Sequence, residues 1–239
     1  MSSLKHLAHF ALAGCLLSAA ANVAATPIVF TNSGHNTFAS VDLGSDTSGL
    51  ISNASPPGVL PLFSSAVRSS SGNSSSASGS ANTGQLDVST ETVSSSLFAA
   101  ATAGAGFTGM FTGTGQQVGF IIDYTTSDEN FGGLASSQLF VTLLSNGTTL
   151  LDKIFSSSEL FKQSFILSSG STNLFDIQLI GDAVADGSVN DIALGSNIAS
   201  ASFSINAAPV PEPSVAWLML GGIGLLGLAR RKMGRAAIH

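Results

Sequence analysis

Three aspartates, Asp182, Asp186 and Asp191, are the side chains in this sequence with the clearest capacity for chemistry. Glycine and asparagine residues lie between them, and apolar segments flank the stretch. Hard cations such as Ca²⁺ prefer several carboxylate and carbonyl oxygens, which a loop of this composition can supply. The spacing differs from that of an EF-hand, and Asp, Asn and Gly also mark ordinary turns. A calcium site in a loop and a plain turn are therefore both open, and no other cofactor is expected.

Side chains for catalysis are scarce in the middle of the chain. Between Thr26 and Pro209 there is one histidine, His35, and no cysteine. No Gly-x-Ser-x-Gly sequence surrounds any serine, and a two-histidine metal motif needs a second histidine. His35 stands between Gly34 and Asn36, which favours a loop. We therefore do not expect an enzyme.

Sugar recognition has limited support in the aromatic residues. Tyr124 is the only tyrosine, and the only tryptophan, Trp217, lies near the C-terminus. Most phenylalanines fit the apolar faces of strands. A structural role is favoured, with a weak glycan- or calcium-binding module as the alternative.

The charges are few and are unevenly placed. Charged residues make up 9% of the chain, against roughly 25% in typical soluble proteins. Four of the eight Lys and Arg residues lie in the last ten positions, a pattern that argues against a nucleic-acid partner. Between Thr26 and Pro209, thirteen acids and three cations give a net charge of −10. An acidic body followed by a basic tail indicates a chain in several sections.

The N-terminus has the pattern of a secretory signal peptide at residues 1–25. Lys5 precedes an apolar run over residues 7–21, and small residues follow up to Ala25. This order predicts Sec export and cleavage by signal peptidase between Ala25 and Thr26, with cleavage after Ala21 as the second choice. The mature chain then has no cysteine and no disulfide.

A competing processing signal overlaps this segment. Residues 12–15, Leu-Ala-Gly-Cys, are similar to a bacterial lipobox, in which Cys15 would become the lipidated first residue. The apolar run continues after Cys15, whereas a lipoprotein usually turns polar there. Signal peptidase cleavage is therefore favoured, with lipidation as the alternative.

The C-terminus consists of a proline-rich stretch, an apolar run and a basic tail. Residues 209–214 contain three prolines and cannot be helical throughout. Residues 215–229 are apolar, and as a helix they would span about 22 Å, short of the roughly 30 Å of a bilayer core. The tail at residues 230–239 begins with Arg230, Arg231 and Lys232, which should remain in the cytoplasm. This order predicts a short transmembrane helix with the body outside the cytoplasm.

Val210, Pro211, Glu212 and Pro213, followed by this apolar run and the basic cluster, resemble the PEP-CTERM sorting domain of Gram-negative bacteria. The resemblance implies recognition by exosortase, a membrane-embedded transpeptidase-like enzyme, with cleavage close to Pro-Glu-Pro. It also implies transient anchoring in the inner membrane. The destination would be the cell surface or an extracellular matrix with exopolysaccharide, as in a biofilm.

The body, residues 26–208, alternates apolar and polar residues in short segments, which is typical of β-strands. Asn146-Gly147 between two apolar runs predicts a tight hairpin. A single helical turn is expected at residues 158–161. We predict an all-β antiparallel β-sandwich, similar to a jelly roll. The expected strands cover residues 28–30, 37–41, 85–93, 107–114, 118–124, 139–144, 148–155, 163–167, 173–180 and 201–206.

Residues 64–80 contain ten serines in seventeen positions. A composition of this kind supplies little apolar surface for a core. We expect a flexible surface loop here, with an interdomain linker as the alternative.

Overall fold

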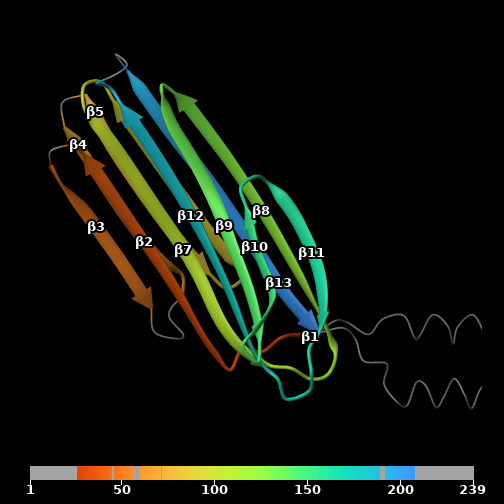
Figure 1. Cartoon of the computed structure of the whole chain (residues 1–239). Coiled ribbons are helices and arrows are strands. Elements are labelled where there is room, and N and C mark those ends of the chain that lie inside the picture. The colour runs from red at the N-terminus through yellow and green to blue at the C-terminus, as the bar shows by residue number, and fades with distance from the viewer. Residues whose placement is uncertain (1–25, 45, 56–59, 71, 189–191, 208–239) are drawn as a thin grey trace, which may run out of the picture. The chain divides into compact units, whose positions relative to one another are not determined.

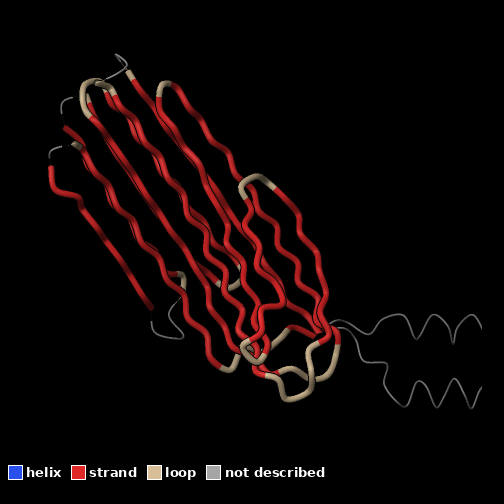
Figure 2. The backbone as a smooth tube through the Cα atoms, viewed as in Figure 1, coloured by secondary structure: helices blue, strands red, loops and turns tan. Residues whose placement is uncertain are grey.

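A computed structural model of the chain describes residues 26–44, 46–55, 60–70, 72–188 and 192–207. Residues Pro27–Ala207 form one compact unit. Within the described ranges the backbone consists of strands and their connections (Figure 2). Consequently, none of these residues belongs to a helix with the length and apolarity needed to cross a bilayer.

In the described part of the chain, thirteen strands form two layers, confirming the predicted antiparallel β-sandwich (Figure 1). Sheet A has the order β11-β8-β13-β6-β5-β4, with β1 beside β13, and sheet B has the order β10-β9-β12-β7-β2-β3. The strands of sheet A are β1 (Thr26–Pro27), β4 (Leu62–Ser70), β5 (Asn73–Asn82), β6 (Gln85–Ser94), β8 (Gln117–Phe131), β11 (Glu159–Ile166) and β13 (Ala193–Ala207). The strands of sheet B are β2 (Asn32–Leu43), β3 (Asp46–Ser55), β7 (Phe98–Thr112), β9 (Gly133–Ser145), β10 (Thr148–Phe155) and β12 (Thr172–Asp186).

The connections between β6 and β13 follow the jelly-roll pattern. Within these eight strands, sheet A has the order β11-β8-β13-β6 and sheet B the order β10-β9-β12-β7. Apart from the β9–β10 hairpin, each connection crosses from one sheet to the other, as in two interlocked Greek keys. Four further strands extend both sheets on the same side, with β5 and β4 beyond β6 and with β2 and β3 beyond β7, whereas β1 pairs with β13.

The predicted Asn146-Gly147 hairpin is confirmed. β9 and β10 pair antiparallel around this turn. Asn146 has φ 49° and Gly147 has φ 79°, as a type I′ turn requires. Asn146 also accepts a hydrogen bond at its side-chain oxygen from the backbone N–H of Thr172, at 3.0 Å. The turn residues therefore both reverse the chain and contact the neighbouring strand.

The expectation of a loop or linker at residues 64–80 is wrong, because this serine-rich stretch forms the hairpin of β4 and β5. Every second residue of β5 is buried, and these residues are small: Asn73, Ser75, Ala77, Gly79 and Ala81. Small side chains let the two sheets approach closely, so that Cα atoms of β5 lie within 8 Å of Cα atoms of β7. Packed sheets are usually about 10 Å apart. Low apolar content is thus compatible with a thin region of the sandwich.

Two further expectations about the backbone are wrong. Residues 159–161 belong to β11, which pairs with β8 along its whole length, and form no helical turn. The first strand is β1 at Thr26–Pro27, whereas residues 28–30 are irregular. The backbone N–H of Ile28 nevertheless donates a hydrogen bond of 3.1 Å to the carbonyl oxygen of Ile205 in β13.

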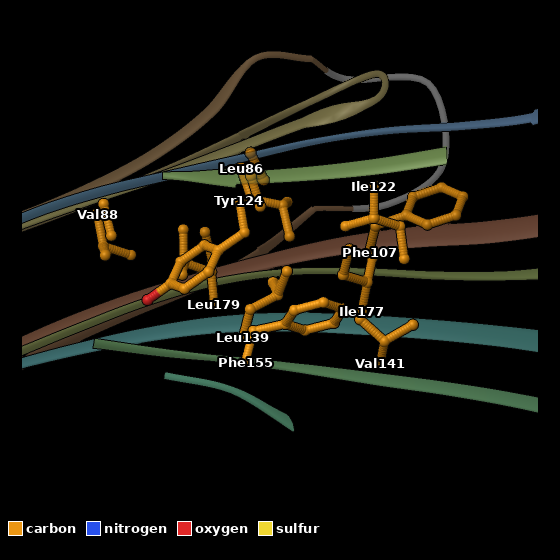
Figure 3. Packing of buried hydrophobic residues seen from close by; sticks show 14 of the residues in the cluster. Leu86, Val88, Phe107, Ile122, Tyr124, Leu139, Val141, Phe155, Ile177 and Leu179 are labelled. Carbon is orange, nitrogen blue, oxygen red and sulfur yellow. The ribbon is translucent and has the colours of Figure 1, made fainter. Parts of the chain in front are cut away.

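The core changes in character along the sandwich. Near the start of β1 and the end of β13 it contains several phenylalanines, among them Phe107, Phe120 and Phe175, and the Phe175 ring packs against the other two. Figure 3 shows Phe107 with other buried side chains of this core, among them Ile122, Leu139 and Phe155. In the opposite half, the buried residues of β7 are small: Ala99, Ala101, Ala103, Gly104 and Ala105. We call the first end the terminal end, because Pro27 and Ala207 both lie there, and the opposite end the distal end. The sheets are therefore held apart by rings at the terminal end and approach closely toward the distal end.

Candidate functional site

The residues predicted to direct processing lie almost entirely outside the described ranges. Cys15 and Ala25, the motif at residues 210–213 and the basic cluster at residues 230–232 are not described. Thr26, the predicted first residue of the mature chain, is also the first residue of β1. The predicted transmembrane segment at residues 215–229 is likewise outside the described ranges.

The three aspartates of the predicted calcium site do not share a loop. Asp182 and Asp186 both lie in β12, with their side chains on the outer face of sheet B. They are four positions apart along an extended strand, a distance of about 13 Å at ~3.3 Å per residue. One Ca²⁺ binds its ligands at about 2.3–2.6 Å, so these two carboxylates cannot both hold it. The predicted loop is wrong because β12 continues through Asp186.

The residues directly after Asp186, the last residue of β12, form a turn. Asp186 accepts hydrogen bonds at Oδ1 from the backbone N–H of Ser188 at 3.0 Å and from its hydroxyl at 2.5 Å. Asp191 lies outside the described residues. Among the described residues, no three His, Cys, Asp or Glu side chains come together as a metal site. Calcium binding stays a prediction, and its predicted ligands are now Asp186 and Asp191 without Asp182.

His35 lies in a strand, which corrects the predicted loop. It belongs to β2 and pairs with Phe107 of β7, and the two ring centroids are 4.9 Å apart. Partial burial removes water from the imidazole and lowers the pKa of His35. The side chain is therefore part of the aromatic packing at the terminal end and favours its neutral form.

A partly buried group of polar side chains, absent from the sequence-based predictions, joins the two sheets. We call it the seam cluster: Tyr124, Thr126 and Asp128 of β8, Ser137 of β9 and Asn197 of β13. The Tyr124 and Ser137 hydroxyls are 2.6 Å apart, and the Ser137 and Thr126 hydroxyls are also 2.6 Å apart. Thr126 donates to Asp128 at 3.2 Å, and the Asn197 amide donates to both Thr126 and Asp128. The bonds thus form a chain from the buried tyrosine to a carboxylate at the surface.

The seam cluster lies where the sandwich is open along one side. β11 pairs with β8 only up to Tyr124, and β10 pairs with β9 only from Leu139 onward. Beyond these residues β8 and β9 are both edge strands, as Figure 1 shows at their distal ends. The polar side chains therefore connect the sheets at a side where β10 and β11 no longer extend them.

Asn197 is the most constrained member of the cluster. Its side chain is 0% exposed, and its Oδ1 has no hydrogen-bond partner among the described residues. A Cβ atom on Gly181, in the opposite sheet, would lie 2.7 Å from this oxygen. The amide therefore fits only because a glycine faces it. The sequence signal that we missed is the alternation Tyr124-x-Thr126-x-Asp128, which continues the inward face of a predicted strand with polar residues.

An ion pair lies at the edge formed by β10 and β11. The Lys153 ammonium is 2.5 Å from a carboxylate oxygen of Glu159. It also lies 4.3 Å from the ring centroid of Phe155 and 4.6 Å from that of Phe161. Cations are attracted to the faces of aromatic rings at such distances. This arrangement attaches the end of β10 to the start of β11.

The outer face of sheet A is rich in hydroxyl groups. Cross-strand rows join serines on neighbouring strands, for example Ser65 of β4 with Ser78 of β5 and Ser89 of β6. Asp87 and Glu91 lie among them, and Ser80 donates a hydrogen bond of 3.2 Å to Asp87. We call this surface the serine face, formed by Ser65, Ser76, Ser78, Ser80, Ser89, Ser196, Ser200 and Ser202. It carries hydroxyl groups from neighbouring strands together with the two acids Asp87 and Glu91.

Structural comparison gives only weak similarities. TmCBM61 in complex with β-1,4-galactotriose has 7% identity, with 56% of this chain and 88% of that chain covered, at a TM-score of 0.26. The tailspike protein 4 of bacteriophage CBA120 has 8% identity over 56% of this chain and 19% of that chain, at a TM-score of 0.21. An α-xylosidase from Xanthomonas citri has 10% identity over 77% of this chain and 19% of that chain, also at a TM-score of 0.21. Values this low carry no functional argument.

The sequence comparison is informative at the C-terminus. No match was found among the curated proteins. The family model of the PEP-CTERM protein-sorting motif matches residues 209–235, where Val210, Pro211, Glu212 and Pro213 are followed by the apolar run and the basic cluster. The match confirms the resemblance and implies export, with membrane anchoring before processing. The chain is therefore a PEP-CTERM domain-containing protein, exported and targeted to exosortase.

Proposed function

We propose that this protein is a non-catalytic structural component of the bacterial cell surface or extracellular matrix, displayed after exosortase processing. The sorting motif at residues 209–235 is the observation that carries the proposal. In this scheme signal peptidase cleaves after Ala25 during Sec export. The apolar segment at residues 215–229 holds the chain in the inner membrane, and exosortase then cleaves near Pro-Glu-Pro.

Two properties of the sandwich support association with exopolysaccharide. The serine face presents hydroxyl groups from neighbouring strands, so that it can exchange hydrogen bonds with a hydrated polymer. The acids of the body keep its net charge well away from zero, which favours solubility over self-association. A surface of this kind suits many weak contacts with a polymer better than one tight site.

The sorting step is tested by replacing the acid of the motif. We expect Glu212→Ala to accumulate as an uncleaved precursor in the inner membrane, whereas the natural sequence is processed. The matched control is Glu91→Ala, which removes an exposed acid from sheet A and should be processed normally. Cell fractionation with mass spectrometry of both termini gives the readout. Normal processing of Glu212→Ala, or mature protein that retains Trp217, would contradict the proposal.

The matrix role is tested separately with the processed protein. We expect weak binding to purified exopolysaccharide that is reduced when Ser78 and Ser89 of the serine face are both changed to Glu. Binding that requires calcium would instead support the alternative of a calcium-dependent module. No binding in either condition would contradict the association with exopolysaccharide without affecting the sorting step.

A further inference from the structure

We propose that the terminal end of the sandwich is a docking surface for a phospholipid bilayer, which it faces while the chain is anchored. The inference rests on the proposed membrane-anchored stage. It adds the orientation of the β-sandwich relative to the membrane, which the sorting motif alone does not supply.

The first observation is the absence of charged side chains at this end. The described residues there include no Asp, Glu, Lys or Arg, and His35, the nearest titratable group, lies just beyond them with a pKa lowered by burial. These residues are 27–34, 60–63, 81–86, 110–119, 143–149, 164–173 and 203–207. The charged side chains of the described body all lie farther toward the distal end.

The uncharged zone has a measurable depth. Lys162 lies four residues before Ile166, the end of β11, and Asp152 and Asp176 lie four residues after the starts of β10 and β12. Four residues of strand cover about 13 Å. The Debye length at physiological ionic strength is about 8 Å, so charges behind this zone interact only weakly with a surface at the terminal end. Asp87 is farther still, because it pairs with Ser200, seven residues before Ala207.

The second observation is the exposed apolar residues. Val29 is 81% exposed and Ile166 is 80% exposed, and both lie at the terminal end. Exposed apolar side chains without nearby charge can enter the headgroup region of a bilayer at little cost. The glycine, serine and threonine residues in the connections at 113–116 and 167–171 can hydrogen-bond to lipid headgroups.

The third observation is the chain connection. β13 ends at Ala207 on this end, and the sorting motif begins at residue 209. The membrane-directed part of the chain therefore leaves the sandwich at its uncharged end. The distal half contains the acids Asp42, Glu91, Asp128, Glu129 and Asp186, which an anionic bilayer surface would repel.

The test uses the full chain with Cys15→Ser, reconstituted into vesicles of phosphatidylethanolamine and phosphatidylglycerol. A fluorescent label is attached at Ile166→Cys or, as the matched control, at Ile192→Cys. Ile192 is 58% exposed and adjoins the start of β13 at the distal end. Lipids with a quencher near the headgroup should quench the label at 166 roughly threefold more than the label at 192, because docked side chains lie about 5–10 Å deep in the interface.

Charge variants of the labelled protein test the cause. Thr114→Glu with Ser169→Glu places two acids at the terminal end, whereas Asn130→Glu places one at the distal end. We expect the first variant to lose the extra quenching in anionic vesicles and the second to retain it. Circular dichroism of both variants verifies that the sandwich is folded.

Equal quenching at positions 166 and 192 would overturn the proposal. Quenching at 166 only after exosortase is added to the vesicles would also overturn it and assign the surface to the enzyme. The vesicle assay contains no exosortase in its main arm. Its failure is therefore distinguishable from a failure of the proposed processing, which is measured in cells.

Discussion

At the scale of single residues, most ionisable side chains of the described body lie at its surface, and the partly buried His35 makes stability depend on pH. Its pKa is lowered because the ring is partly buried against Phe107. The folded protein therefore binds a proton less readily than the unfolded chain, in which the histidine pKa is about 6.5. The contribution of His35 to the free energy of unfolding is fully present above the pKa of the unfolded chain. It is lost as the pH falls through the lower pKa of the folded protein.

We therefore expect the free energy of unfolding to decrease as the pH is lowered below about 6.5. His35→Gln should flatten this dependence between pH 6.5 and pH 5, before the carboxylates titrate. Urea unfolding at several pH values gives the measurement. An identical pH dependence in the variant would show that His35 does not contribute.

Calcium binding is also decided by individual residues. Binding of Ca²⁺ to the folded state near Asp186 and Asp191 raises stability by about 2.7 kcal/mol when calcium is at 100 times its dissociation constant. The prediction is a higher melting temperature in millimolar calcium than in chelator, lost in Asp186→Asn. Asp182→Asn is the control, since Asp182 lies about 13 Å away along β12. Equal melting temperatures with calcium and with chelator would exclude the site.

At the scale of elements, the β4–β5 hairpin shows how a serine-rich segment enters a core. A Cβ atom at Gly79 would lie 2.4 Å from the carbonyl oxygen of Gly104 in the opposite sheet. Neither backbone can yield without moving its sheet, so we expect Gly79→Ala to destabilise the protein by about 1–3 kcal/mol. Thermal or urea unfolding measures this change.

Gly34→Ala in β2 is the matched control for this substitution. No atom lies within 4 Å of a Cβ placed there, and Gly34 does not have a positive φ. Its stability should be unchanged or slightly raised, because alanine restricts the unfolded chain. If both variants lose stability equally, the close approach of the sheets is not the cause.

The elements also show which features local sequence can reveal. The Asn146-Gly147 turn was predictable because two adjacent residues determine its backbone geometry. The β4–β5 hairpin was not, because its burial depends on the alanines of β7, which are distant in sequence. The seam cluster was missed for the same reason, since Asn197 and Ser137 both reach Thr126 only after β8, β9 and β13 are assembled. The sorting motif was predictable because its residues are consecutive.

At the scale of the whole molecule, the described body is a compact unit whose core is continuous from β2 to β13. We expect deletion of residues 208–239 to leave its cooperative unfolding transition unchanged and to release the body into the periplasm. Calorimetry of the truncated and full chains, with fractionation of the cells, gives the measurement. A broad or shifted transition in the truncated chain would contradict this independence.

The position of β13 has a mechanical consequence. The strand lies between β6 and β8, pairs with both, and ends at Ala207, next to the sorting motif. A pull on the attached C-terminal end acts along the axis of β13. It loads the hydrogen bonds of both ladders together in shear, whereas a peeling force would break them one at a time. A body tethered through this strand should therefore resist being pulled off the surface under flow. In single-molecule experiments, the force needed to unfold the body should be higher when it is applied at Ala207, along β13, than when it peels β4 from the edge of sheet A.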